Sequence, residues 1–319
     1  MSEVFRPYLI IAGPTASGKT ALSVQVAKAL GGDVVCADSM QIYDGVSIGT
    51  ARPTPAEMQG VAHHLFGHVP LCEKYSVVRY LEEAEAVVAT LFQKGTPPIL
   101  CGGTGLYIQS FIENRQLFLQ EPDPVLRQQL DALDEAALFA RLQEVDPLAA
   151  SRLHPHDRHR VIRALEVYYT TGYTIEQQNE QSLSKPSPYT PCLFVLDFHS
   201  RERLYDRINR RVDIMLEQGL LEEAHRILQT DPDATVTQAI GYKEFAAYFS
   251  GNITLEEAAE KLKQQTRRYA KRQLSWFRRM SSAHTLWVDD YASTEALAEQ
   301  VLTIYREFTE RGQKNGEIR

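Results

Sequence analysis

The chain has 319 residues, of which 44% are hydrophobic and 24% are charged, and its formal net charge is −7. These ordinary globular values exclude wholesale disorder, and the length predicts two domains or one large domain with an insertion. The acidic balance excludes a protein that coats nucleic acid indiscriminately, but it allows a local basic surface.

The first hundred residues alternate between strand and helix patterns. The first strand, Tyr8 to Ala12, is too short for a signal-peptide core, and no later stretch has the length of a membrane span. We therefore expect a soluble, cytoplasmic protein with no membrane partner. Further along we expect helices at Ala21–Leu30 and Val77–Phe92 and strands at Asp33–Ala37 and Pro97–Cys101. Continuous apolar strands that alternate with helices predict a parallel sheet covered on both faces.

The pattern changes after the third strand. Between residues 115 and 191 helical periodicity replaces the strand signals, and a polar stretch with prolines follows. Leu193–Phe198 resembles a returning core strand, and the chain from Arg201 to about Arg311 has helical patterns. The prediction is an α/β fold: a P-loop-type core of residues 1–114 and 192–319, its parallel sheet flanked by helices, with an inserted all-helical domain of residues 115–191.

A glycine-bearing loop joins the first strand to the first helix. It matches G-x-x-x-x-G-K-[ST] in full through Gly13, Pro14, Thr15, Ala16, Ser17, Gly18, Lys19 and Thr20. In such a loop the backbone N–H groups and the helix N-terminus face an anion, the lysine neutralises a terminal phosphate and the hydroxyl binds Mg²⁺. The motif predicts a polyphosphate site with Thr20 as a metal contact, and it does not identify the polyphosphate.

Two more loops leave predicted strand ends. Asp38-Ser39-Met40-Gln41 follows the second strand, and Gly102-Gly103-Thr104-Gly105 follows the third. Ligands collect at the carboxyl ends of parallel strands, so we expect both loops beside the P-loop. Asp38 fits either a Mg²⁺ ligand or a general base. Ser39 and Gln41 have the donors and acceptors that read a base edge, and Thr104 can donate to a phosphate oxygen.

The P-loop alone leaves several functions open. No N-K-x-D guanine motif occurs, and Asp197, which follows an apolar run, is better explained as structural than as a Walker-B carboxylate. A small-molecule kinase, a prenyltransferase for free adenylate and a non-catalytic RNA-binding ATPase are the alternatives. Four dispersed cysteines form no C-x-x-C pair, which argues against a disulfide framework and a thiolate metal site.

Two basic segments indicate contact with nucleic acid. Eight lysines and arginines and no acid lie between Lys261 and Arg279. Lys263, Arg267 and Lys271 are spaced i, i+4, i+8, which predicts a cationic stripe along a helix. Arg158, Arg160 and Arg163 form a second cluster. Such side chains bind phosphates and position RNA without reading its sequence.

The motifs together resemble the bacterial tRNA dimethylallyltransferases, also called tRNA isopentenyltransferases. They occur in that family's order over nearly the whole chain: the P-loop, DSMQIY from Asp38, GTARP from Gly49, HHL from His63, GGTGLY from Gly102, HPHDRHRVIRALE from His154, AIGYKEF from Ala239 and KRQLSWFR from Lys271. His156 stands where family members often have asparagine. No Cys/His finger of the eukaryotic kind follows Arg279.

The resemblance implies a reaction. A dimethylallyl group would move, with Mg²⁺, from dimethylallyl diphosphate to the exocyclic N6 amine of the adenine 3′-adjacent to the anticodon in tRNA. The P-loop would hold the prenyl diphosphate rather than ATP. Asp38 would be the base, while Thr104 and Arg211 would act on the departing diphosphate.

The resemblance also implies a set of tRNA contacts. The helical insertion would close over the anticodon stem-loop, and we expect the protein to act as a monomer. Trp276 has a ring that can stack on a base, but a core position explains this residue at least as well. The implied contacts are Asp38, Ser39, Met40, Gln41, Thr104, Arg127, His159, Arg160, Val161, Ile162, Arg163, Lys271, Arg272, Trp276 and Arg278.

Overall fold

The computed structural model describes residues 5–117, 123–183, 185–230 and 235–317. The chain divides into two compact units. The core unit comprises Met1–Ile112 and Pro188–Arg319, and the helical unit comprises Glu113–Ser187. Among the described helices, none is long and apolar enough to cross a membrane.

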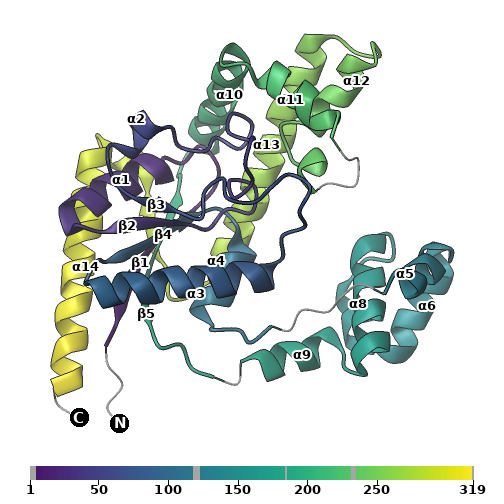
Figure 1. The fold of residues 1–319 in the computed structure, drawn as a ribbon, viewed down its shortest axis with the longest axis horizontal. Coiled ribbons are helices and arrows are strands. Elements are labelled where there is room, and N and C mark those ends of the chain that lie inside the picture. The colour runs from purple at the N-terminus through teal and green to yellow at the C-terminus, as the bar shows by residue number, and fades with distance from the viewer. Residues whose placement is uncertain (1–4, 118–122, 184, 231–234, 318–319) are drawn as a thin grey trace. The chain divides into compact units, whose positions relative to one another are not determined.

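The core unit is built on one six-stranded sheet in which all strands are parallel, in the order β3-β2-β4-β1-β5-β6 (Figure 1). Ile10 in the central strand β1 pairs with Leu100 of β4 and Leu193 of β5. The predicted parallel α/β sheet is therefore confirmed. The strands are β1 Pro7–Ala12, β2 Asp33–Cys36, β3 His63–His64, β4 Pro98–Gly102, β5 Thr190–Asp197 and β6 His284–Trp287.

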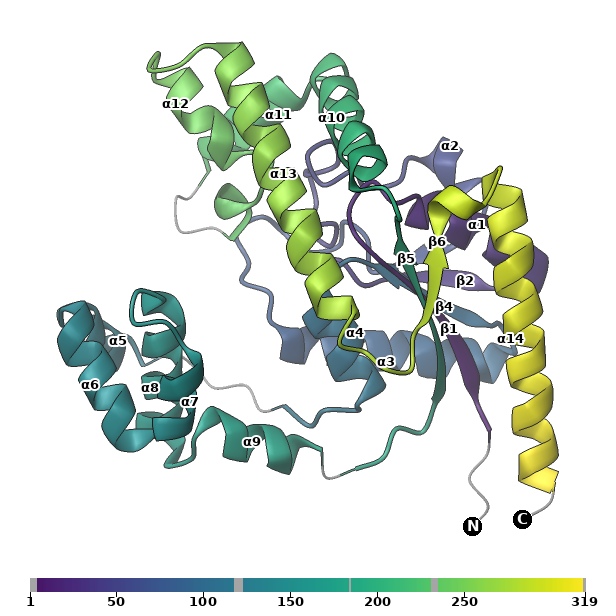
Figure 2. The ribbon, with the colours of Figure 1, turned by 180° about the vertical axis from the view of Figure 1, so that it is seen from behind.

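Helices cover both faces of this sheet. The α-helices of the core unit are α1 Lys19–Leu30, α2 Pro55–Met58, α3 Val77–Lys94, α4 Gly105–Ile112, α10 Arg201–Glu217, α11 Leu220–Leu228, α12 Ala246–Phe249, α13 Leu255–Phe277 and α14 Thr294–Glu317. Short 3-10 turns lie at Thr235–Gln238, Lys243–Phe245 and Val288–Asp290. In Figure 2 the long helix α14 runs beside β6 and α1.

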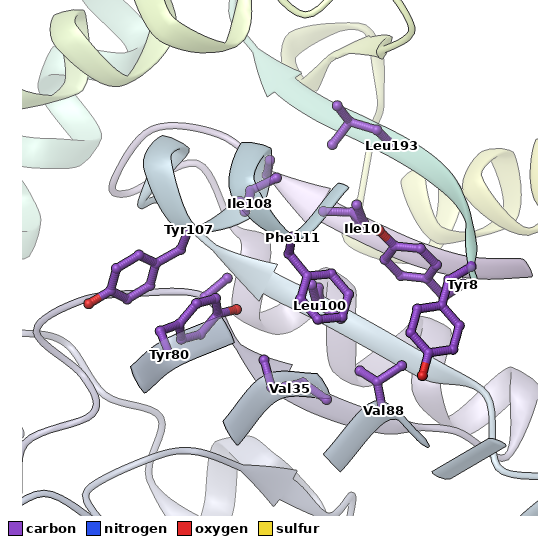
Figure 3. Close-up of a cluster of buried hydrophobic side chains, with 14 of the residues drawn as sticks. Tyr8, Ile10, Val35, Tyr80, Val88, Leu100, Tyr107, Ile108, Phe111 and Leu193 are labelled. Carbon is purple, nitrogen blue, oxygen red and sulfur yellow. The ribbon is translucent and has the colours of Figure 1, made fainter. Parts of the chain in front are cut away.

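The sheet's two faces pack against different helices because side chains alternate along each strand. Tyr8 and Ile10 of β1 point toward α3 and α4, where Tyr80 and Phe111 complete a buried cluster (Figure 3). Leu9 and Ile11 point to the opposite face and pack with α1 and α14. Burial on both faces explains why the central strands have continuous apolar sequences.

Two edge strands of the sheet were not predicted from the sequence. No strand is predicted at His63–His64, and His284–Trp287 lies within the segment predicted to be helical. Both are short, and in β6 only Leu286 is buried, so neither carries an apolar run. The strand β5 also begins at Thr190, three residues before its predicted start, and the helical unit ends at Ser187.

The helical unit has its own small core. Its helices are α5 Pro124–Asp131, α6 Glu135–Val145, α7 Pro147–Arg152, α8 Arg158–Thr171 and α9 Ile175–Ser182. Asp123, Asp134 and Asp146 cap three of them by accepting backbone N–H bonds. Leu130, Leu138 and Leu142 pack with apolar residues of α8, which explains how a segment of this size folds around its own core.

Candidate active site

Three loops meet at one edge of the sheet. The P-loop follows β1, the Asp38 loop follows β2 and the Gly102–Gly105 turn follows β4, and these strands are neighbours in the order β2-β4-β1. Parallel strands end at the same edge, so their loops converge there. Direct bonds join two of the loops, because Thr104 Oγ1 accepts the N–H of Ser39 at 2.9 Å.

The P-loop has the backbone that its glycines predict. Gly13 and Gly18 have φ angles of 148° and 97°, in the left-handed region. A Cβ atom on Gly13 would lie 2.9 Å from the carbonyl oxygen of Leu196 in β5. The helix α1 begins at Lys19 and has no side-chain cap at Gly18. Its first N–H groups are therefore available to an anion.

The ammonium group of Lys19 lies within the P-loop, where it can bind an anionic ligand. Its Nζ donates to the carbonyl oxygen of Pro14 at 2.7 Å, within the loop itself. The pKa of Lys19 is lowered to about 8, chiefly by burial and to a smaller extent by the charge of Arg211, while Cys101 and Asp38 act in the opposite direction. An incoming phosphate would reverse this shift by favouring the ammonium form.

Two arginines of α10 extend the positive charge around the loop. Arg207 Nε donates to the carbonyl oxygen of Ala16 at 2.7 Å, and Arg211 makes a long contact of 3.5 Å to the carbonyl oxygen of Ala51. Burial lowers the pKa of both arginines, and the charge of Asp38 acts in the opposite direction on Arg211. Within the described residues neither arginine has an ion-pair partner. Arg211 was predicted near a diphosphate, whereas Arg207 was missed.

Asp38 lies among these cations. Its Oδ1 accepts the N–H of Met40 at 3.0 Å, which shapes the loop after β2. Its charge influences the pKa of Lys19, Arg211 and Tyr269, so the carboxylate is within electrostatic reach of all three. The site therefore combines one carboxylate with a surplus of positive charge.

The helix α13 closes the site with residues that the sequence analysis missed. Gln273 is 5% exposed, accepts the Thr15 N–H at 2.9 Å and donates to the Gly103 carbonyl oxygen at 3.0 Å. Tyr269 hydrogen-bonds with the side chains of Thr104 and Gln273, while burial and the charge of Asp38 raise its pKa. Gln273 belongs to the KRQLSWFR segment, but the sequence gives no sign that it joins the two loops, and Tyr269 lies outside the quoted motifs.

Gln41 is less free than its predicted role requires. Its Nε2 donates to the carbonyl oxygens of Thr50 and Ala51, at 2.9 and 3.1 Å. Both amide hydrogens are thereby used within the protein, and only Oε1 is left as an acceptor. In this structure Gln41 therefore has an acceptor but no unused amide hydrogen for a base, and its contact with adenine stays a prediction.

A buried carboxylate holds the neighbouring loop. Glu223 of α11 is 6% exposed and accepts the N–H groups of Ser47, Ile48 and Gly49 at 2.8–3.1 Å. The hydroxyl of Tyr242 donates to the same carboxylate at 2.8 Å. Burial raises the pKa of Glu223, but these donors outweigh burial and leave the pKa below its usual value. Glu223 therefore supports the loop that contacts Gln41 and Arg211.

Two of the three side chains in the predicted cationic stripe on α13 have partners within the core unit. Lys263 forms ion pairs with Asp213 and Glu260 at 2.8 and 3.2 Å, and Arg267 donates to Asn209 at 2.6 Å. These two side chains are engaged within the core unit, by Asp213 and Asn209 of α10 and by Glu260 one turn earlier on α13. Lys271 and Arg272 are exposed, as predicted for residues that contact RNA.

Two other predicted contacts on α13 have partners in the core. The ring of Trp276 lies against Gly105, where an added Cβ would come within 2.4 Å of it. Arg278 is exposed and pairs with Asp197 at 2.9 Å, and Arg201 pairs with the same carboxylate at 2.9 Å. Asp197 is 2% exposed and both its oxygens accept from arginines, which agrees with its predicted structural role. A groove between α10 and α13 is lined by Arg201, Tyr205, Lys271 and Arg278, among others.

The predicted contacts in the helical unit fall into two groups. His159, Arg160 and Arg163 are exposed on α8. Val161 and Ile162 are each 1% exposed and pack in the unit's core, so their side chains are directed away from solvent, while their place in the tRNA-contacting segment stays a prediction. An amphipathic helix buries some members of any continuous segment.

Arginines of the helical unit also have internal partners. Arg127 pairs with Asp131 and Glu166 at 3.0 and 3.2 Å. Arg158 donates to the carbonyl oxygens of Leu133 and Asp131 at 2.8 and 2.7 Å, which satisfies the end of α5. Arg158 is therefore structural rather than part of a free basic cluster.

Comparison with known proteins identifies the family. The family model described as IPP transferase matches residues 41–280, and one described as isopentenyl transferase matches residues 6–73. The chain is 43% identical to a tRNA dimethylallyltransferase of Caldanaerobacter subterraneus over 300 residues, which cover 92% of this chain and 95% of the relative. A tRNA dimethylallyltransferase of Pelotomaculum thermopropionicum is 44% identical over 303 residues, with 92% and 95% coverage.

Solved structures agree with this assignment. A tRNA isopentenylpyrophosphate transferase from Bacillus halodurans is 38% identical, with a TM-score of 0.72 and 99% of each chain covered. A eukaryotic dimethylallyltransferase acting on tRNA is 29% identical, with a TM-score of 0.82 over 96% of this chain and 80% of the other. The chain belongs to the IPP transferase family, the tRNA dimethylallyltransferases.

Proposed function

We propose that this protein transfers a dimethylallyl group from dimethylallyl diphosphate to the N6 amine of the adenine 3′-adjacent to the anticodon in tRNA, releasing diphosphate. The observation that carries the proposal is the charge balance of the site. Lys19 of the P-loop and Arg207 and Arg211 of α10 supply positive charge. The negative charge of Asp38 raises the pKa of Lys19 and of Arg211. Such a site suits an anionic leaving group beside a single base.

The diphosphate would bind at the P-loop. The uncapped N-terminus of α1 provides backbone N–H groups, and Lys19 and Arg211 provide fixed positive charge. Donors that are already oriented toward a developing negative charge stabilise it more strongly than water does, because they need no reorganisation. As the C1–O bond breaks, the electron pair stays on the departing diphosphate, whose charge these groups offset.

Magnesium fits the same loop. Thr20 lies at the first turn of α1 beside Lys19, where its hydroxyl would hold the ion together with diphosphate oxygens. Within the described residues no cluster of three His, Cys, Asp or Glu side chains could hold a metal ion by itself. Mg²⁺ commonly binds through few protein ligands and the substrate's phosphates, so this donor set suits it. When bound, the ion would neutralise charge on the diphosphate.

Asp38 would accept the proton of the amine. Oδ1 is engaged by the Met40 N–H, and the second carboxylate oxygen can face the nucleophile. The N6–C1 bond forms while the N6–H proton passes to this oxygen. Thr104 Oγ1 donates to Ser39 Oγ over 3.3 Å, a long bond that it can exchange for one to the leaving oxygen. Gln41 Oε1 would accept from the adenine.

The tRNA would contact exposed basic side chains. Lys271 and Arg272 on α13 and Arg278 at its end suit backbone phosphates, and Trp276 lies next to Gly105 at the active site. In the helical unit we propose His159, Arg160, Arg163 and Arg127 as contacts for the anticodon stem-loop. We further propose that the protein acts in the cytoplasm, where its substrate is found, and as a monomer.

One assay tests the proposal and its alternatives. Purified protein is incubated with Mg²⁺, labelled dimethylallyl diphosphate and either tRNA or AMP, and the products are digested and analysed as nucleosides. We expect label on the adenine beside the anticodon in tRNA. Label on AMP alone would favour a free-adenylate prenyltransferase. Label on neither acceptor would contradict the proposal.

A further inference from the structure

Gln273 is a buried polar residue in the middle of a basic helix. It lies on α13 with Arg272 before it in sequence, yet it is 5% exposed whereas Arg272 and Lys271 are exposed. Its amide group reaches two different loops, through Oε1 to the Thr15 N–H and through Nε2 to the Gly103 carbonyl oxygen. One side chain thereby joins the P-loop to the turn after β4.

The Gly103 turn is shaped to receive this side chain. A Cβ atom on residue 103 would lie 2.2 Å from Nε2 of Gln273, well inside van der Waals contact. Glycine at this position thus allows the backbone carbonyl to approach the amide. The close fit indicates that Gln273 and the turn are matched to each other.

The same face of α13 meets the site at two further points. Tyr269, one turn earlier, hydrogen-bonds with Thr104 and with Gln273 itself. Trp276, three residues later, lies on Gly105. The helix therefore has an inner face toward the loops and an outer basic face, and Gln273 is the central contact of the inner face.

We propose that Gln273 is a positioning residue that sets the spacing between the P-loop and the Gly102–Gly105 turn, and thereby the shape of the diphosphate site. This inference rests on the proposed function. Lys19 and Thr104 lie on the two joined loops, so both groups that would act on the diphosphate depend on the spacing. Gln273 also engages the Thr15 N–H, which removes that donor from those that face the anion.

This role differs from that of its neighbours. Lys271, Arg272, Trp276 and Arg278 are proposed to contact tRNA, whereas the hydrogen bonds of Gln273, to Thr15, Gly103 and Tyr269, are made inside the protein. Loss of Gln273 should therefore weaken binding of the prenyl diphosphate and spare binding of tRNA. A contact with RNA would give the reverse, and a purely structural role would lower stability without separating the two affinities.

The test compares three variants of the full chain. Gln273→Met keeps length and helix propensity but removes the hydrogen bonds to Thr15, Gly103 and Tyr269. Gln264→Ala changes an exposed glutamine on the same helix, and Lys19→Ala tests the diphosphate site itself. Dissociation constants are measured by calorimetry for dimethylallyl diphosphate with Mg²⁺ and no tRNA, and by filter binding for tRNA alone. Thermal unfolding is recorded in parallel.

We expect Gln273→Met to weaken dimethylallyl diphosphate binding about tenfold, or about 1.4 kcal/mol, with tRNA affinity within about twofold of wild type. Gln264→Ala should match wild type. If Lys19→Ala weakens binding and Gln273→Met does not, the positioning role is wrong and the proposed function stands. If Lys19→Ala binds the diphosphate normally, the proposed function fails. A loss of tRNA affinity in Gln273→Met would also overturn the inference.

A double-mutant cycle tests the contact even if Gln273→Met is unstable. Gly103→Ala forces the Gln273 amide away and should weaken diphosphate binding in the wild-type background. In a Gln273→Ala background the same change meets no amide, so its effect should largely disappear. Fully additive effects would show that the two residues do not act together and would overturn the inference.

Discussion

Replacement of Glu223 by glutamine should destabilise the core unit and disturb the active site together. The Glu223 carboxylate accepts three backbone N–H groups of residues 47–49 and the hydroxyl of Tyr242. Glutamine keeps one side-chain oxygen as an acceptor. Its NH₂ group replaces the other oxygen and cannot accept the hydrogen bonds that are donated there. Hydrogen bonds to a charged group contribute about 1.5–3 kcal/mol each, and an unsatisfied buried donor costs about 1–3 kcal/mol. We expect a loss of about 2–4 kcal/mol in the free energy of unfolding.

The pH dependence of this loss follows from the pKa of Glu223. Its pKa is lowered in the folded protein, so its stabilising contribution is present above the unfolded value of about 4.3 and is lost as pH falls through the folded value. The difference between wild type and Glu223→Gln should therefore be full at pH 7 and shrink in acid.

Urea unfolding followed by circular dichroism measures this difference at pH 7 and in acid. Glu222→Gln, an exposed change on the same helix, is the matched control and should cost less than about 0.5 kcal/mol. Because residues 47–51 contact Gln41 and Arg211, Glu223→Gln should also lower kcat. Stability within about 0.5 kcal/mol of wild type would refute the reasoning.

Two other predictions concern the ligands. Since the pKa of Lys19 is about 8, binding of dimethylallyl diphosphate should weaken as pH rises through 8 and the ammonium loses its proton. Calorimetry from pH 6.5 to 9.5 checks this, and a Lys19→Met variant that kept the same profile would contradict it. Lys271→Gln with Arg272→Gln should weaken tRNA binding and reduce the slope of log K against log salt by about 1.4–1.8, or 0.7–0.9 per lost phosphate contact. Filter binding from 50 to 300 mM KCl measures the slope, and an unchanged slope would argue against these phosphate contacts.

The parts of the site that sequence could predict are those made of local motifs. The P-loop and the loops after β2 and β4 each follow an apolar strand, and parallel topology brings such strand ends together. Gln273 and Tyr269 of α13 were missed because their contacts with the loops are not visible in the sequence, although Gln273 lies within the KRQLSWFR segment. Gln273 lies among lysines and arginines, and its burial becomes visible only when the helix is packed against the loops.

Tertiary partners explain the other differences. The sequence indicates no ion-pair partner for Lys263, because its helix has no acid from Lys261 onward. In the structure Asp213 of α10 and Glu260, just before that stretch, pair with it. Val161 was grouped with its basic neighbours, although the helical period turns it into the core. The edge strands β3 and β6 are too short and too exposed to produce an apolar signal.

The most direct test of the account concerns the hydrogen that leaves the adenine amine. Asp38→Asn keeps the Oδ1 acceptor for the Met40 N–H, so the loop should hold its shape while the base is lost. In single-turnover assays with tRNA, Mg²⁺ and labelled dimethylallyl diphosphate, we expect prenyl transfer to slow by about 10²–10⁴-fold while the affinities for both substrates persist. Transfer by Asp38→Asn at close to the wild-type rate would contradict the central claim.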